Sequence, residues 1–145
     1  MKRFICIILL IITSTGCSLQ EKPNEKQVPV VGEIIINEKR YEMMVGKYRW
    51  NGDETKIRKV DAASPVEIAK EFDNIKLEKS KKIDIAIPNT PGITVYQWSQ
   101  EGDITEIPIT KNQITVPSIN GHYIYEVVGK WDDGEASYIF DIDVK

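Results

Sequence analysis

The C-terminal segment alternates apolar and polar residues as two paired strands do. Every second residue in 123–131 and in 136–144 is aromatic, β-branched or small, and this period of two places those residues on one face of a strand. Asp133-Gly134 lies between the two runs and is a strong signal for a two-residue hairpin turn. A turn at this dipeptide predicts an antiparallel hairpin in which Tyr125 faces Ile142, with one aromatic core face and one mixed face.

Shorter runs of the same kind precede this hairpin. They predict a hairpin around Glu38-Lys39 and strands within residues 33–37, 40–45, 55–60, 77–87, 93–98, 104–109 and 113–116. Short strands with turn signals about every 8–12 residues are typical of an all-β sandwich. We therefore expect a single β-sandwich domain over residues 30–145.

One helix start interrupts the strand pattern. Ser64 is suited to cap a helix, Pro65 fits the first helical position, and Glu67 stands three residues after the cap, where it completes a capping box. Phe72 then falls on the apolar face. The pattern predicts one short helix of about two turns that packs Phe72 against the core.

The start of the chain has the character of an export signal. Lys2 and Arg3 precede an unbroken apolar run over residues 4–12, which is shorter than the ~20 residues that cross a bilayer. The end of this segment resembles the lipobox of bacterial lipoproteins: Thr15, Gly16 and Cys17 match, whereas Ser14 stands where the family usually has Leu. The resemblance implies that residues 1–16 are removed. Cys17 is then lipidated on its sulfur and acylated on its amine, for example with palmitate.

The rest of the leader region and the charge limit the class of protein further. Residues 17–29 are polar and hold two prolines, so we expect a flexible linker between the lipidated cysteine and the domain. Cys6 lies in the leader, so the mature chain keeps no thiol for a disulfide, a metal site or a nucleophile. Loss of Lys2 and Arg3 leaves 17 basic against 22 acidic residues, which moves the net charge from −3 to −5. This acidic balance argues against a nucleic-acid partner.

Two resemblances concern the domain. Asn120-Gly121-His122-Tyr123 resembles the start of the penultimate strand in immunoglobulin-like and PKD-like domains, which implies that the Tyr123 hydroxyl bonds back to the preceding corner. Trp98 resembles the core tryptophan of such sandwiches, although the immunoglobulin disulfide is absent. The chain also resembles a group of small uncharacterised lipoproteins of Bacillus-like Gram-positive bacteria, in its segments 48–50, 61–65, 95–98 and 123–131. That second resemblance implies no activity.

The candidate chemistry of the chain is sparse. His122 is the only histidine, and no partner cysteine, second histidine or activated serine accompanies it. Glu126, Asp141 and Asp143 share one face of the terminal hairpin, with Glu126 opposite Asp141 in the predicted register. This acidic patch is suited to a basic partner, but a solvated face explains it more simply, and a flat strand face offers calcium its six to eight oxygens poorly. We expect no catalytic residue, metal or cofactor.

Three tryptophans complete the candidate residues. Trp98 is expected in the core, whereas Trp50 and Trp131 each lie beside a turn and are placed either to pack there or to anchor a partner. Packing is the simpler interpretation of both.

The sequence leaves two main functions open, and an enzyme, which needs a concave polar cluster, ranks last. The first is a monomeric, non-enzymatic binding module held by Cys17 on the extracytoplasmic face of the cell membrane, with a protein or envelope component as its partner. The alternative is a cell-surface protease inhibitor that presents the loop at 88–92 or the loop at 101–103.

Overall fold

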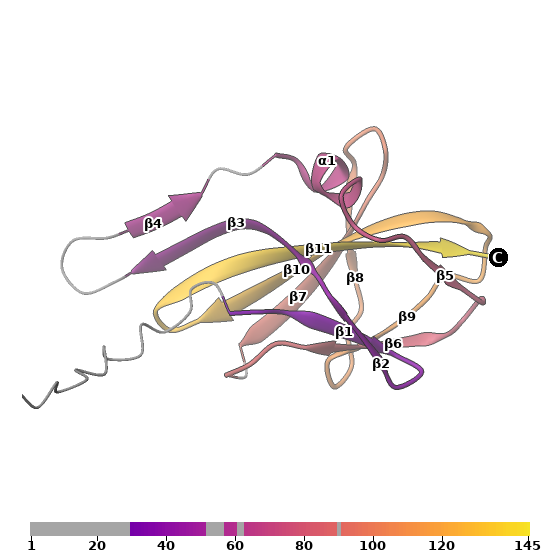
Figure 1. Ribbon diagram of the computed structural model, residues 1–145, viewed down its shortest axis with the longest axis horizontal. Helices are drawn as coiled ribbons and strands as arrows, with labels where there is room; N and C mark the ends of the chain where they lie inside the picture. Colours follow the sequence, from indigo (N-terminus) through magenta and orange to yellow (C-terminus); the bar gives the residue numbers. More distant parts are fainter. Residues whose placement is uncertain (1–29, 52–56, 61–62, 90) are drawn as a thin grey trace, which may run out of the picture.

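The structure, a computed structural model, describes residues 30–51, 57–60, 63–89 and 91–145. In these residues the chain forms two packed β-sheets and one short helix (Figure 1). The all-β sandwich expected from the strand pattern is therefore confirmed. The leader, Cys17 and the linker lie outside the described residues.

One sheet has four strands in the order β2-β1-β6-β9, namely β1 (Glu33–Ile36), β2 (Lys39–Glu42), β6 (Lys82–Ala86) and β9 (Gln113–Thr115). The other sheet has seven strands among the described residues, in the order β4-β3-β11-β10-β7-β8 with β5 also beside β11. Its strands are β3 (Met44–Asn51), β4 (Ile57–Val60), β5 (Ile75–Leu77), β7 (Gly92–Trp98), β8 (Ile104–Ile107), β10 (Gly121–Trp131) and β11 (Gly134–Val144). All described pairs are antiparallel except β5 with β11.

The strand order is that of an immunoglobulin-like sandwich with an insertion. Strands β1, β6 and β9 form one layer, and β11, β10, β7 and β8 form the other, as strands A, B, E and G, F, C, C′ do in that fold. The chain between β1 and β6 supplies β2, β3, β4, the helix and β5. Because β3 and β5 both pair with β11, the insertion widens the second layer beyond its last strand.

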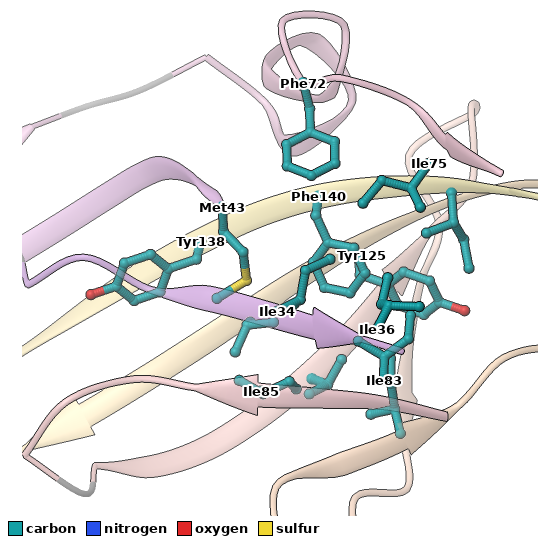
Figure 2. Close-up of a cluster of buried hydrophobic side chains, with 14 of the residues drawn as sticks. Ile34, Ile36, Met43, Phe72, Ile75, Ile83, Ile85, Tyr125, Tyr138 and Phe140 are labelled. Carbon is teal, nitrogen blue, oxygen red and sulfur yellow. The ribbon is translucent and has the colours of Figure 1, made fainter. Parts of the chain in front are cut away.

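The core lies between the two layers and is rich in isoleucine (Figure 2). Ile34 and Ile83 from the smaller sheet are fully buried. Opposite them, the Tyr125 ring stacks on Phe140 with centroids 5.1 Å apart. The Tyr138 hydroxyl donates to the Val30 carbonyl over 2.7 Å, and burial raises the pKa of Tyr138 to about 12. This hydrogen bond thus joins Val30 to strand β11 beside the core.

The terminal hairpin keeps its predicted faces but not its predicted register. Tyr125 pairs with Phe140, not with Ile142, and Trp131 pairs with Gly134, so the turn is Asp132-Asp133. The register differs from the expected one by two residues, and a shift of two leaves every side chain on its original face. Gly134 is a strand residue and not a turn residue, so the turn does not explain why glycine stands there. The reason is space, because a Cβ would lie 2.6 Å from the Trp50 ring and 2.7 Å from the Arg49 carbonyl oxygen.

Three other strand predictions need correction. The first hairpin turns at Asn37-Glu38, one residue earlier than expected, and both residues have positive φ, 49° and 66°. The run expected as one strand over 40–45 is divided between β2 and β3, which belong to different sheets. The run expected as one strand over 77–87 is two elements, because its first residue ends β5 while β6 belongs to the other sheet.

The helix start is where the sequence places it. Helix α1 (Pro65–Ala69) has Ser64 as its N-cap with a complete capping box to Glu67, and it is shorter than the two turns expected. Phe72 is buried, and its ring centroid lies 6.5 Å from that of Phe140 (Figure 2). Helix α1 itself lies on the side of the seven-stranded sheet that faces away from the smaller sheet (Figure 1).

The Tyr123 hydroxyl donates to the Ile119 carbonyl over 2.9 Å. This is the corner hydrogen bond expected at the start of the penultimate strand of an immunoglobulin-like sandwich.

Candidate functional site

The outer face of the seven-stranded sheet, which points away from the smaller sheet, carries buried and apolar side chains as well as exposed polar ones. Tyr125 and Val127 point into the core, so Ile124, Glu126 and Val128 point outward. The strand register then forms rows across this face. One row is Glu106, Tyr96 and Glu126, and the next is Ile104, Trp98 and Ile124.

A groove of about 670 Å³ lies on this face. Its apolar side is formed by Tyr96, Trp98 and Ile104, and Ile104 is 54% exposed. Val128 and Ser137 also line it, on β10 and β11. We call this feature the outer groove, and define it by these five residues together with Glu126, Glu135, Lys47 and Arg49.

Glu126 is the most unusual member of the outer groove. The residue is only 4% exposed, and its Oε2 accepts a hydrogen bond from the Trp98 indole Nε1 over 3.0 Å. A buried carboxylate is costly unless donors surround it, and the indole is the only partner that the described residues show for it. Two expectations are therefore wrong: Glu126 is not part of a solvated face, and it does not face Asp141, because it pairs with Ile139.

Trp98 also differs from its expected place. It does not enter the core between the sheets; it packs on the outer face against a small cluster of Ala69, Ile124 and Ile139, and is only partly buried. Val95, on the opposite face of the same strand, is the fully buried residue. The alternation of residues 93–98 carried this signal, since Trp98 shares its face with Thr94 and Tyr96 and not with Ile93 and Val95.

Two parts of the insertion border the outer groove. Helix α1 packs through Ala69 on Ile124 and Ile139, next to Trp98. Strand β3 contributes Lys47 and Arg49, and the Arg49 Nη2 lies 3.9 Å from the Glu135 Oε1 on β11. The chain thus brings together residues that are widely separated in the sequence. Tyr96, Ile104, Lys47 and Arg49 were not among the candidate site residues expected from the sequence.

The other two acidic residues of the predicted patch lie with His122. The His122 Nδ1 is 2.9 Å from Asp143 Oδ1, and its Nε2 is 3.2 Å from Asp141 Oδ2. Burial raises the pKa of Asp141, while the hydrogen bond from His122 is the main cause that lowers the pKa of Asp143. Asp141 is 4% exposed, and its Oδ1 has no hydrogen-bond partner among the described residues. Asp141 and Asp143 therefore form a polar cluster with the histidine, and Ile124 separates His122 from Glu126 along β10.

Trp50 and Trp131 pack on each other at the opposite end of the terminal hairpin. Their ring centroids are 5.0 Å apart, and Trp50 is only 6% exposed. Trp131 is partly buried against the core, and its Nε1 lies 3.4 Å from the Pro88 carbonyl oxygen. The rings meet in a packed pair rather than standing apart as two separate surface anchors.

The loop at 101–103 is a tight turn. Gly102 N donates to the Ser99 carbonyl over 3.1 Å, and Asp103 N donates to the Ser99 Oγ over 3.0 Å. A turn closed by its own hydrogen bonds does not present an extended backbone. The loop at 88–92 includes Thr90, which lies outside the described residues.

The described residues contain no group of three or more histidine, cysteine or acidic residues arranged to hold a metal ion. Nor does any helix among them have the length and apolar character needed to cross a bilayer.

Comparisons with other proteins add little to this geometry. No protein-family model matches the chain, and no curated protein matches it. Among solved structures, the chain is similar to the extracellular domain of a B. thetaiotaomicron protein described as a hybrid two component system. The identity is 16% and the TM-score 0.37, and the match covers 81% of this chain and 16% of that one.

Proposed function

We propose that this protein is a lipid-anchored, extracytoplasmic binding module without catalytic activity, and that its ligand lies in the outer groove. The anchor rests on the resemblance of Thr15, Gly16 and Cys17 to a lipobox and on the short apolar run before them. The polar linker that follows suits a domain held at a distance from the membrane. The resemblance to small lipoproteins of Gram-positive bacteria supports the same location.

The observation that carries the proposal is the outer groove itself. Concave sites lined by apolar and aromatic side chains with a few fixed polar groups are where proteins bind ligands. Tyr96, Trp98 and Ile104 supply the apolar part, and the Glu126 carboxylate is held in place by the Trp98 indole. An apolar residue in place of Glu126 would avoid the cost of burying a polar group with one hydrogen-bond partner among the described residues.

The position of His122 supports a binding role over catalysis. Both of its ring nitrogens face aspartate oxygens, within 3.2 Å. Ile124 separates it from Glu126 on β10, under the cover of α1. The residue type most often used as a general base thus lies against two aspartates outside the outer groove.

A matched pair of isoleucine variants tests the proposal. Ile104 is 54% exposed and lines the outer groove, whereas Ile119 is 71% exposed and lies outside it. We expect the full-length lipoprotein, purified in detergent, to co-sediment with lipid-extracted cell envelopes. Ile104→Arg should weaken this binding at least tenfold, because the long side chain fills the groove, and Ile119→Arg should leave it unchanged. Equal binding by both variants and the unchanged protein would contradict a ligand site in the outer groove.

A further inference from the structure

The outer groove crosses several strands. Its residues come from β3, β11, β10, β7 and β8, which are neighbours in that order. Adjacent strands lie ~4.8 Å apart, so the groove extends over ~19 Å of the sheet. Together with a volume of about 670 Å³, this length fits an extended chain of linked units better than one small molecule.

The backbone of the central strands of the outer groove is not free to bind such a chain. Each of the central strands β11, β10 and β7 has a hydrogen-bonded neighbour on both sides. A peptide that binds as an added strand needs an exposed sheet edge, and the outer groove lies on the face. Recognition in the groove must therefore come from side chains.

Among the residues that line the outer groove, basic and acidic side chains are equal in number. Lys47 and Arg49 contribute two positive charges, and Glu126 and Glu135 contribute two negative charges. A strongly anionic or cationic chain would meet repulsion from one of these pairs along its length. The balance favours a neutral ligand that offers both hydrogen-bond donors and acceptors.

The remaining features define the chemistry of that ligand. A carboxylate has about four acceptor positions, and the described residues give Glu126 one donor, the Trp98 indole. Ligand hydroxyl groups supply further donors, and the guanidinium of Arg49 and the ammonium of Lys47 supply donors in return. Tyr96 and Trp98 are amphipathic aromatics that suit a surface with apolar C–H groups beside hydroxyls.

From these features we infer that the outer groove binds a neutral glycan chain, with the C–H faces of its sugar rings against Trp98 and Tyr96 and its hydroxyls on Glu126. The inference rests on the proposed function and specifies its ligand. Neutral sugar rings combine apolar C–H faces with a dense set of hydroxyl donors and acceptors, which is the combination that suits the groove.

The first experiment separates a glycan from a protein partner. Lipid-extracted envelopes are digested with proteinase K, and the co-sedimentation of the full-length lipoprotein is repeated with the Ile104→Arg and Ile119→Arg variants. Binding that survives digestion and is still reduced at least tenfold by Ile104→Arg supports the inference. Binding that the digestion abolishes overturns the inference and leaves the proposed function standing, because the groove then binds a protein.

The second experiment uses defined probes. Chitin tetrasaccharide, laminarin, xylan and galactomannan are compared with alginate as a polyanion and polylysine as a polycation, each as a competitor of envelope binding. We expect at least one neutral glycan to compete, and its effect to change by less than about twofold between low and high salt, since no ion pair forms. Competition by a charged polymer alone, or by none of the neutral glycans, overturns the inference.

Variants of the groove complete the test. Trp98→Ala should weaken binding of the competing glycan at least tenfold, and Trp98→Phe should weaken it less, because the ring face is kept while the N–H to Glu126 is lost. Tyr96→Ala provides an independent variant if Trp98→Ala unfolds, which a thermal melt detects. Unchanged glycan binding in folded Trp98→Ala or Tyr96→Ala protein would overturn the placement of the sugar rings.

Discussion

The structure leaves no room for a side chain at Gly134. A Cβ there would lie 2.6 Å from a ring carbon of Trp50 and 2.7 Å from the Arg49 carbonyl oxygen. Gly134→Ala therefore overpacks the hairpin end, and we expect it to lower the free energy of unfolding by ~1–3 kcal/mol.

Gly92 is the matched control, because the described residues bring only the Lys130 carbonyl oxygen near a Cβ there, at 3.8 Å. We expect Gly92→Ala to change the free energy of unfolding by less than ~0.5 kcal/mol. Urea denaturation measures both variants. An equal effect of the two substitutions would mean that close packing on Trp50 is not the reason for glycine at 134.

The His122 cluster predicts opposite pH effects at two neighbouring carboxylates. The pKa of Asp141 is raised, so its protonated form favours folding, and this contribution is lost as the pH rises from the ordinary value of 3.8 through the raised pKa. The pKa of Asp143 is lowered, so its ionised form favours folding, and that contribution is lost as the pH falls below 3.8.

The measurement is urea denaturation of Asp141→Asn and Asp143→Asn proteins between pH 3 and pH 7. Relative to the unchanged protein, Asp141→Asn should gain stability as the pH rises, because it removes a buried carboxylate that must ionise. Asp143→Asn should lose relative stability over the same rise, because it removes the carboxylate paired with His122. Parallel pH curves for the two variants would contradict this assignment.

At the scale of elements, the capping box of α1 is a local motif with a direct test. The Ser64 Oγ accepts from the Glu67 backbone N–H over 3.3 Å. Ser64→Ala should lower the free energy of unfolding by ~1 kcal/mol, and Ser64→Asp, which keeps an acceptor at the cap, should not.

Thermal or urea melts measure this difference, and equal stabilities of the Ser64→Ala protein and the unchanged protein would show that the cap does not hold the helix. Because α1 packs on Ile124, Ile139 and Trp98, the Ser64→Ala protein also reports whether the helix supports ligand binding in the outer groove.

The elements show how far the sequence predicts the fold. The capping box at Ser64 and the Tyr123 corner were predictable because their donors and acceptors lie within four residues of each other. The hairpin register was not, because a shift of two residues preserves the faces that alternation specifies. Asp133-Gly134 then predicted the wrong turn. Glycine is needed at 134 because the Trp50 ring lies against it, and Trp50 is on β3, a strand that is remote in the sequence.

Predicting the outer groove from the sequence would have required the pairing between strands that are far apart in the chain. Alternation alone placed Tyr96 and Trp98 on one face of their strand and Glu126 on one face of another. That Glu126 lies beside Tyr96 follows only from the register of β7 with β10. Lys47 and Arg49 join them through the pairing of β3 with β11, which neither strand's own sequence specifies.

At the scale of the whole molecule, the proposed anchor gives the last prediction. Cys17 is the cysteine of the lipobox-like segment, while Cys6 lies within the apolar run of the leader. Lipidation of Cys17 would join the chain to several acyl groups, and each buried methylene contributes ~0.8 kcal/mol to membrane binding. Cys17→Ser should therefore remove the proposed anchor, and the protein should leave the membrane fraction or accumulate as an unprocessed precursor.

Cys6→Ser is the control, because it changes the other cysteine and keeps the site of lipidation. Fractionation of cells followed by immunoblotting should find the Cys6→Ser protein in the membrane fraction at mature size, as for the unchanged chain. The unchanged chain and the Cys6→Ser protein should also incorporate labelled palmitate, and the Cys17→Ser protein should not. A Cys17→Ser protein that stays in the membrane at mature size would mean that something other than a lipid on Cys17 holds the domain there.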